Sequence, residues 1–325
     1  MSAAPGLPKQ ARTAGEAEAE GAPVNQPGRD FAGYRWNYPA LRWPGNAGLA
    51  VSFVLNVEEG AELALSAGDA RNESHHEVTH EVVGAPDLCM QSMFEYGARV
   101  GYWRITRALM QAGIPLTLNA CARALETTPW IASDAAAQGF EICCHGWRWE
   151  SHAGMVEEEE RALIARCVNS IRRLHGRAPV GWHTKSSASV HTRRLLAEHG
   201  GFLYDSDAYN DDLPYYVQVA GQPHLVLPYA FDTNDMRFFD SHAYVRGSDF
   251  AGYAIDAFDA LLAESRAEPR MLSIGLHTRI IGRPGRIGGL HQLMRHITQR
   301  GGAWCATREQ IARHWLAHVP PEAAA

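Results

Sequence analysis

One segment of the chain joins a buried strand pattern to side chains that can do chemistry. Residues 140–144 form an apolar run, and His145, Trp147, Arg148 and Trp149 follow it. An imidazole can transfer protons near neutral pH. Two tryptophans that flank an arginine suit the wall of a pocket for a flat ligand. We therefore expect a catalytic His145 and a substrate-binding wall made by the two tryptophans and the arginine.

Similar polar side chains stand at the ends of other predicted strands. They are Glu58 and Glu59 after residues 50–57, His183 and Lys185 at the end of 180–183, Asp207 and Tyr209 after 202–205, Asn234 after 225–228, and His277 at the end of 271–277. A buried carboxylate and a histidine at such a place can act as base and acid. We expect Glu58 or Glu59 to be the base and His277 the acid, with the other side chains binding substrate.

A structural role is the alternative for each of these residues. The two glutamates could be loop carboxylates that face water, and His145 and His277 could be core histidines with satisfied hydrogen bonds. His75, His76 and His80 lie in a polar segment. We expect these three in an exposed loop, with a lid or a metal group as the alternative.

Apolar runs and apolar residues at helical spacing alternate along the chain. Strands are predicted at 50–57, 115–118, 140–144, 180–183, 202–205, 225–228, 271–277 and 303–305, and helices at 99–112, 128–137, 156–175, 189–198, 249–267 and 287–300 and after Thr307. Strands that alternate with such helices pair in parallel through right-handed crossovers. In a barrel of this kind the carboxyl ends of the strands meet at one mouth, where catalytic residues lie. The pattern predicts one α/β barrel domain at 45–318, with a tail and arm at 1–44 and a tail at 319–325.

The composition is typical of a folded domain and excludes several classes of partner. The 325 residues are 46% hydrophobic and carry a formal net charge of −6. A chain without a basic surplus is not expected to bind nucleic acid, and no apolar run reaches the roughly 18 residues of a membrane span. The sequence does not open with a signal-peptide pattern, so we expect a cytoplasmic location. Six scattered cysteines form no zinc motif, and Cys143 and Cys144 are expected to be reduced core residues.

Three further segments have simple interpretations. Residues 1–30 are rich in Ala, Glu, Gly and Pro, so we expect a mobile tail. Residues 34–44 are aromatic and proline-rich, and we expect an irregular arm over the body or over a neighbouring subunit. The acidic run 157–160 opens a helix that ends in basic residues, which matches the helix dipole and predicts a solvated helix start.

Several stretches resemble the polysaccharide deacetylase superfamily (NodB homology), and in particular its allantoinase branch of PuuE-type enzymes. The matching stretches are 56–60 (Asn-Val-Glu-Glu-Gly), 95–104, 145–149 (His-Gly-Trp-Arg-Trp), 201–209, 232–238, 275–277 and 282–286. They come in the right order and cover nearly the whole ordered chain. The resemblance implies a distorted (β/α) barrel of the NodB type with seven parallel strands.

The resemblance also implies an activity. It points to hydrolysis of a C–N bond in a small cyclic amide, such as an allantoin-like ureide or a cyclic imide, in a homo-oligomer (dimer or tetramer) that needs no metal or other cofactor. The glutamate base would activate water, His145 would orient it or share the oxyanion, and His277 would protonate the leaving nitrogen. Arg104 or Arg148 would hold a carbonyl or ureido group.

The chain departs from the metal-dependent members of the superfamily at their metal site. Their two first-strand aspartates correspond to Asn56 and Glu58, and their second histidine corresponds to Trp149. A catalytic zinc ion normally has three protein ligands and a water molecule. A zinc-dependent deacetylase or amidase that uses Glu58, His145 and His152 stays open as the alternative function. A barrel that binds a small heterocycle or sugar without catalysis is the third possibility.

The chain also departs from the allantoinase branch. At 181–185 it reads Gly-Trp-His-Thr-Lys where the branch is expected to have Gly-Trp-Tyr-Thr-Gly-Arg, and the stretch Glu-Ser-His at 150–152 is unusual. Both differences fall near the expected mouth of the barrel. They leave the class of reaction unchanged and leave the identity of the substrate open.

Overall fold

The computed structural model describes residues 29–74, 80–185, 187–239 and 244–321. The chain divides into two compact units, Met1–Arg35 and Trp36–Ala325. In the first unit, the backbone N–H of Ala32 donates to Asp30. Most of the predicted tail 1–30, the end of the tail 319–325, and the predicted loop residues His75 and His76 lie outside the described residues, while His80 is exposed.

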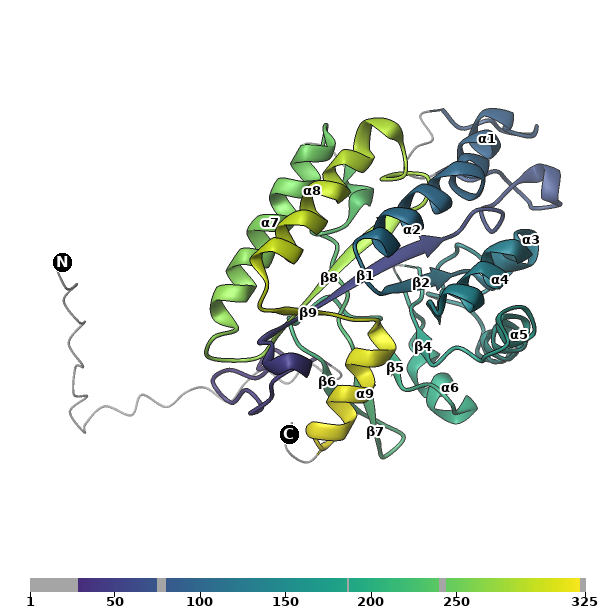
Figure 1. The fold of residues 1–325 in the computed structure, drawn as a ribbon. Coiled ribbons are helices and arrows are strands. Elements are labelled where there is room, and N and C mark those ends of the chain that lie inside the picture. The colour runs from purple at the N-terminus through teal and green to yellow at the C-terminus, as the bar shows by residue number, and fades with distance from the viewer. Residues whose placement is uncertain (1–28, 75–79, 186, 240–243, 322–325) are drawn as a thin grey trace, which may run out of the picture. The chain divides into compact units, whose positions relative to one another are not determined.

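The second unit is built on a curled sheet of mostly parallel strands (Figure 1). Its strands are β1 (Leu49–Val57), β2 (Leu116–Ala120), β3 (Glu141–Cys144), β4 (Gly181–Trp182), β5 (Tyr204–Asp205), β6 (Tyr215–Val219), β7 (Gln222–Val226), β8 (Arg270–His277) and β9 (Ala303–Cys305). Their order is β6-β7-β5-β4-β3-β2-β1-β8, and β9 pairs with β1. The predicted distorted α/β barrel is confirmed.

Seven parallel strands form the main path of the sheet, and two further strands join it. The short β9 pairs with the start of β1, and β6 pairs antiparallel with β7. The sequence patterns predict part of β7 but not β6. On its outer edge, β8 donates hydrogen bonds to irregular segments instead of another strand: Met271 N donates to Asp212 O at 2.7 Å and Gly275 N to Thr233 O at 3.1 Å.

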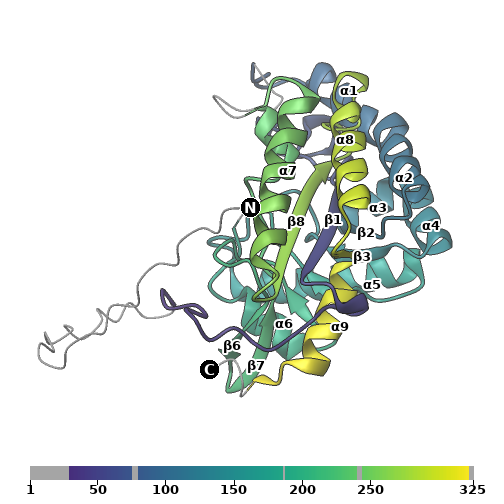
Figure 2. The ribbon, with the colours of Figure 1, turned by 60° about the vertical axis from the view of Figure 1, so that its left-hand side comes forward.

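Helices follow most of the strands and cover the sheet. They are α1 (Leu88–Tyr96), α2 (Tyr102–Gln111), α3 (Ala122–Thr127), α4 (Pro129–Gln138), α5 (Glu157–His175), α6 (Thr192–His199), α7 (Gly247–Glu264), α8 (Pro284–Arg300) and α9 (Arg308–His318), with short helical turns at η1 (Pro44–Asn46), η2 (Leu65–Ala67), η3 (Gly97–Gly101) and η4 (Asp235–Phe238). Figure 2 shows α7 and α8 side by side in front of β8. None of the described helices is long and apolar enough to cross a membrane.

The core explains why the central strands are readable from the sequence. All nine residues of β1 are buried, as expected for a strand that helices or side chains cover on both faces. Cys143 and Cys144 are fully buried free cysteines, as predicted. Part of the predicted arm also packs into the body, because Trp43 is buried and its indole N–H donates to Arg270 O at 2.9 Å.

Two predictions about helices are confirmed only in part. The helix predicted at 99–112 begins earlier, at α1, where Asp87 accepts from Met90 N at 2.9 Å as the N-cap, and it continues through the π-helical turn η3 into α2. The acidic start of α5 is not solvated throughout, because Glu160 is fully buried. Its carboxylate accepts hydrogen bonds from His152, Ser189 and Thr192.

Candidate active site

Strand register brings the predicted catalytic residues to one end of the sheet. Asn56 of β1 is level with Asn119 of β2 and with His277 of β8. Glu58 follows β1, and His145 follows β3 directly. Because these strands are parallel, their carboxyl ends lie at the same edge of the sheet. The residues meet for this reason, although 219 positions separate Glu58 from His277.

Glu58 is the central carboxylate of the site. Its side chain is buried, and its Oε2 accepts from Arg279 Nη1 at 2.7 Å. Its Oε1 lies 3.5 Å from His145 Nε2 and 3.6 Å from His277 Nε2. This oxygen is buried without a hydrogen-bond partner among the described residues. Burial alone would raise the pKa of Glu58, but Arg279 and His277 outweigh burial and hold the pKa well below its usual range.

His277 carries the opposite charge. Its Nδ1 lies 2.6 Å from Asp235 Oδ1, and its backbone N–H donates to the same carboxylate at 2.8 Å. Burial favours the neutral imidazole, but the charges of Glu58 and Asp235 raise the pKa of His277 to about 10. The imidazole is therefore protonated at neutral pH, with its Nε2–H directed to the side of Glu58.

His145 is held in one tautomer by the backbone. Its Nδ1 donates to the carbonyl oxygen of His183. When the ring is neutral, its Nε2 therefore presents a lone pair toward Glu58 Oε1. The next ring, His183, is also fixed: Asn119 Nδ2 donates to its Nδ1 at 2.8 Å, and its Nε2–H donates to Tyr209 Oη at 3.0 Å. Burial, followed by the charges of His145 and Arg308, holds the pKa of His183 well below its usual range, so this ring is neutral.

Glu59 lies behind Glu58 and does not reach the cavity. Its carboxylate accepts from Thr278 Oγ1 and from the backbone N–H of Glu58 at 3.1 Å. Burial raises its pKa, and Arg279 partly offsets this effect. Glu58 lines the cavity and Glu59 does not. Of the two glutamates left open by the sequence, the structure brings Glu58 into contact with the histidines.

The walls of the cavity combine amide, aromatic and charged side chains. Besides Glu58, His145 and His277, it is lined by Asn56, Trp149, His183, Lys185, Tyr209, Tyr229, Phe231, Asn234 and Met236. Tyr209 and Phe231 stack with their ring centroids 4.0 Å apart, and both rings are partly exposed. The cavity measures about 30 Å³, which is room for water but not for a ring-sized ligand. Binding of such a ligand therefore requires side chains at the mouth to move.

Four predicted substrate-binding residues lie elsewhere. Arg148 pairs with Asp69 at 2.6 Å, and the guanidinium of Arg166 lies 3.3 Å from the centroid of the Trp147 ring. Arg104 donates to Gly282 O and to Tyr96 Oη, and Asp207 accepts from Thr184 N at 2.6 Å. None of the four lines the cavity of the catalytic residues. After β3, His145 and Trp149 line the cavity, whereas Trp147 and Arg148 contact neighbouring segments.

The residues of this site do not fit a zinc ion. One oxygen of Glu58, Oε2, already accepts a hydrogen bond from the guanidinium of Arg279. His152 is fully buried, and its Nδ1 lies 2.8 Å from Glu160 in the network beside α5. No three His, Cys, Asp or Glu side chains are arranged to hold a metal ion within residues 29–74, 80–185, 187–239 and 244–321. The alternative ligand set of Glu58, His145 and His152 is therefore not assembled.

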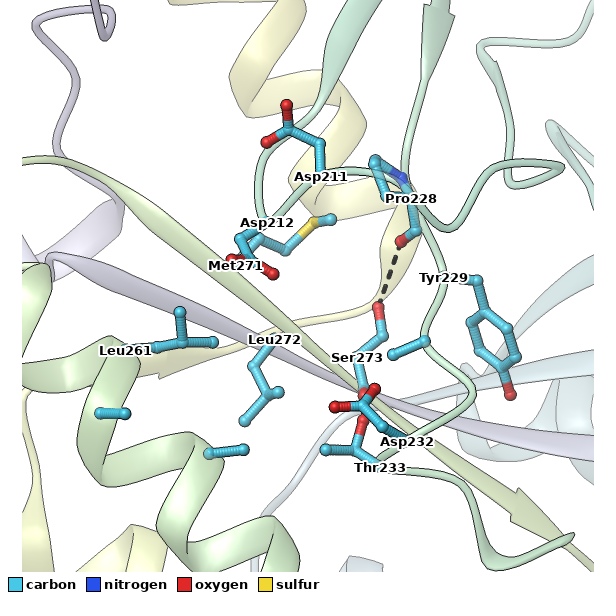
Figure 3. Close-up of a pocket in the computed structure, with 13 residues that line it drawn as sticks. Asp211, Asp212, Pro228, Tyr229, Asp232, Thr233, Leu261, Met271, Leu272 and Ser273 are labelled. Carbon is cyan, nitrogen blue, oxygen red and sulfur yellow. Dashed lines mark hydrogen bonds between the residues drawn. The ribbon is translucent and has the colours of Figure 1, made fainter. Parts of the chain in front are cut away.

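A larger cavity is also lined by Tyr229 but lacks the predicted catalytic residues. It measures about 250 Å³ and is bordered by β8, α7 and the segments at 211–212 and 228–233. Figure 3 shows its aspartates, Asp211, Asp212 and Asp232, and Tyr229 at the right of the view. Ser273 Oγ lies 3.4 Å from Pro228 O there. Both cavities are lined by Tyr229, but only the smaller one contains Glu58, His145 and His277.

Four residues that position side chains of the site were given no role from the sequence. They are Asn119, Tyr229, Asp235 and Arg279, which position His183, Asn56, His277 and Glu58 respectively. Asp235 and Arg279 stand in or beside the stretches at 232–238 and 275–277, so position near a strand end was an available signal. Asn119 and Tyr229 carried the same signal, because they directly follow the predicted strands 115–118 and 225–228.

The family model and a sequence relative that match this chain both carry the name polysaccharide deacetylase. Residues 84–202 match the family model described as "Polysaccharide deacetylase". A Schizosaccharomyces pombe protein named "Putative polysaccharide deacetylase" is 38% identical over 305 residues, which cover 86% of this chain and 94% of that protein.

Two solved structures share both the fold and much of the sequence. The crystal structure of PuuE allantoinase is 43% identical with a TM-score of 0.87, and the match covers 92% of this chain and 99% of that chain. The crystal structure of a probable polysaccharide deacetylase from Pseudomonas aeruginosa PAO1 is also 43% identical, with a TM-score of 0.86 and coverage of 90% and 99%.

Proposed function

This chain belongs to the polysaccharide deacetylase superfamily (NodB homology), in its PuuE-type branch, and from that premise we propose that it opens the ring of a small cyclic amide. The family supports a hydrolase of C–N bonds. The finer proposal is that water attacks the amide carbon of an allantoin-like ureide or a cyclic imide. The observation that carries it is the buried Glu58 carboxylate between two histidines.

The attacking water is activated by Glu58 and His145. A water molecule beside Glu58 Oε1 could donate one proton to this oxygen and the other to His145 Nε2. Arg279 and His277 keep the glutamate ionised, so its acceptor function persists across the physiological pH range. The low pKa makes Glu58 a weak base in the resting site. The second acceptor on His145 therefore helps to orient and polarise the water.

The acid step belongs to His277. Because its imidazole is protonated at neutral pH, it can stabilise the developing oxyanion or give its Nε2 proton to the leaving nitrogen. Asp235 then stabilises the ring through Nδ1. The ring nitrogen of a cyclic imide or hydantoin is a better leaving group than the nitrogen of an open amide. Glu58 as base and His277 as acid are therefore sufficient for ring opening.

We propose that no metal takes part. In the metal-dependent members the ion lowers the pKa of water and binds the carbonyl oxygen. Here two protein cations, Arg279 and protonated His277, contact Glu58 instead. A narrow cavity with aromatic walls also favours a compact ring over a polymer chain, which needs an open groove.

The test is a panel of allantoin, hydantoin, succinimide and an N-acetylglucosamine oligomer, assayed with enzyme stripped of metal by a chelator. We expect ring opening and no release of acetate. Glu58→Gln should lower kcat/KM on the order of 10²-fold or more, because a general base contributes about that much. Glu59→Gln is the matched variant and should cost less, since Glu59 does not reach the cavity.

One control variant and two contradicting outcomes make the result decisive. Glu158→Gln changes an exposed glutamate of α5 and should leave the rate unchanged. Activity that disappears with the metal and returns with zinc would contradict the proposal. Full activity of both glutamine variants would show that neither glutamate activates water.

A further inference from the structure

In the part of the chain that the structure describes, some charged side chains around the cavity have an oppositely charged partner, and one does not. Glu58 is paired with Arg279 and lies 3.6 Å from His277, and His277 is paired with Asp235. Lys185 also lines the cavity, but no carboxylate among the described residues forms an ion pair with it at 4.0 Å or less. Among the described residues, Lys185 is therefore a charged group of the cavity wall without an oppositely charged partner within 4.0 Å.

The ammonium group of Lys185 is held in place by an aromatic ring. Its Nζ lies 3.5 Å from the centroid of the Trp149 ring, which is a cation–π distance. That indole is buried and packs against Phe94, so it is a rigid support. Burial lowers the pKa of Lys185, while the more distant charges of Glu73 and Glu58 raise it. The cation is thus preset at the wall without a close anion.

Lysine is a rare choice in this chain. Only Lys9 and Lys185 are lysines among 30 Lys and Arg residues. A lysine ammonium is a compact point charge with three donors, whereas a guanidinium is a broad planar group. In a cavity of about 30 Å³ the compact cation leaves more space for a ligand.

We propose that Lys185 forms a subsite for an anionic substituent, so that the preferred substrate is a cyclic ureide or imide that carries a carboxylate. This inference rests on the proposed ring-opening function. The scissile amide would lie at Glu58, His145 and His277, and the carboxylate would bind the ammonium group beside Trp149. A carboxylate that enters a partly desolvated site gains a charge-assisted hydrogen bond there, and a neutral amide of the same shape does not.

The experiment compares hydantoin-5-acetate with hydantoin-5-acetamide, which differ in charge but hardly in shape. Binding is measured by calorimetry, and ring opening is measured separately. Wild-type enzyme should bind the acid at least tenfold more tightly than the amide. Lys185→Met should abolish this preference, and Lys185→Arg should keep part of it. Lys9→Met removes the only other lysine and should change nothing.

The outcomes separate the subsite from the reaction. Equal binding of acid and amide by the wild type, or an unchanged preference in the folded Lys185→Met variant, overturns the subsite. If neutral rings are opened in that case, the proposed function stands without it. A preference for the acid that depends on Lys185, with no ring opened, keeps the anion subsite and overturns the proposed reaction. Loss of the preference at high salt would support a direct charge contact.

Discussion

At the scale of single residues, the site depends on two groups whose charges are set by their neighbours. Glu58 is ionised because Arg279 and His277 outweigh its burial, and His277 is protonated because Glu58 and Asp235 outweigh its own. Burial without these charged neighbours would favour the neutral form of both Glu58 and His277. The charge-separated pair is therefore a property of four side chains together.

The pH profile should report this coupling. Activity should fall as pH rises through about 10, because His277 then loses the proton that the reaction uses. Asp235→Asn removes one of the charges that raise this pKa, so the alkaline limb of kcat/KM should move to lower pH by roughly one unit or more. Asp232→Asn, in the same segment, is the matched control. An alkaline limb that stays in place in Asp235→Asn would contradict the assignment.

The same shift makes folding stability depend on pH. The pKa of His277 is raised in the folded state from an unfolded value of about 6.5. Its contribution to stability is therefore complete below pH about 6.5 and is lost as pH rises through about 10. Denaturant unfolding of the wild type should show this loss, and His277→Gln should remove this part of the pH dependence.

At the scale of elements, the π-helical turn η3 brings a backbone against the site. Gly97 lies so close to Glu59 and Thr278 that a Cβ there would be 2.6 Å from Thr278 Oγ1 and would overlap the Glu59 carboxylate. A π turn in a helix is often found at a functional site. Here it lets the α1–α2 segment pack directly behind the two glutamates.

Gly97→Ala should therefore lower both stability and activity. Overpacking of this kind typically costs about 1–3 kcal/mol, and displacement of Glu59 would also disturb Glu58. The matched control is Gly288→Ala in α8, where an added Cβ meets nothing within 4 Å. That variant should gain about 0.5–1 kcal/mol, since glycine is unfavourable in a helix interior. Thermal unfolding and kcat/KM of the two variants check both statements, and equal effects would contradict the close packing.

At the scale of the whole molecule, the second unit leaves a large aromatic side chain on its surface. Trp36 is 90% exposed, at the start of the segment predicted as an arm. Large aromatic side chains are enriched at interfaces between proteins. This exposure and the branch resemblance support the proposal that copies of the chain associate.

We predict a dimer or tetramer in solution, measured by light scattering or sedimentation at micromolar concentration. Trp36→Ser should shift the mass toward the monomer. Trp130→Ser changes another exposed tryptophan, on α4, and serves as the control. A wild-type protein with monomeric mass would contradict the proposal, and an unchanged mass of Trp36→Ser would place the interface elsewhere.

Local patterns predict much of this fold and miss elements that lack them. The apolar runs of β1, β3 and β8 have clear ends, and the glutamates and Gly176 mark the ends of α5. The strand β6 was missed because its residues are mostly half-buried and form no apolar run. The start of the helix at α1 was missed because Asp87 follows Gly84 and Pro86, which are typical of a loop.

By itself, the sequence determined the family, the α/β barrel and the set of strand ends at which Glu58, His145 and His277 stand. These follow from the period of apolar residues and from short motifs, which are local properties. Only the tertiary structure decided that Glu58 and not Glu59 faces the cavity, that Arg148 points elsewhere, and that Arg279 and Asp235 set the charges. Those features depend on side chains that are hundreds of positions apart in the chain, such as Glu58 and Arg279, and a local pattern carries no information about such a contact.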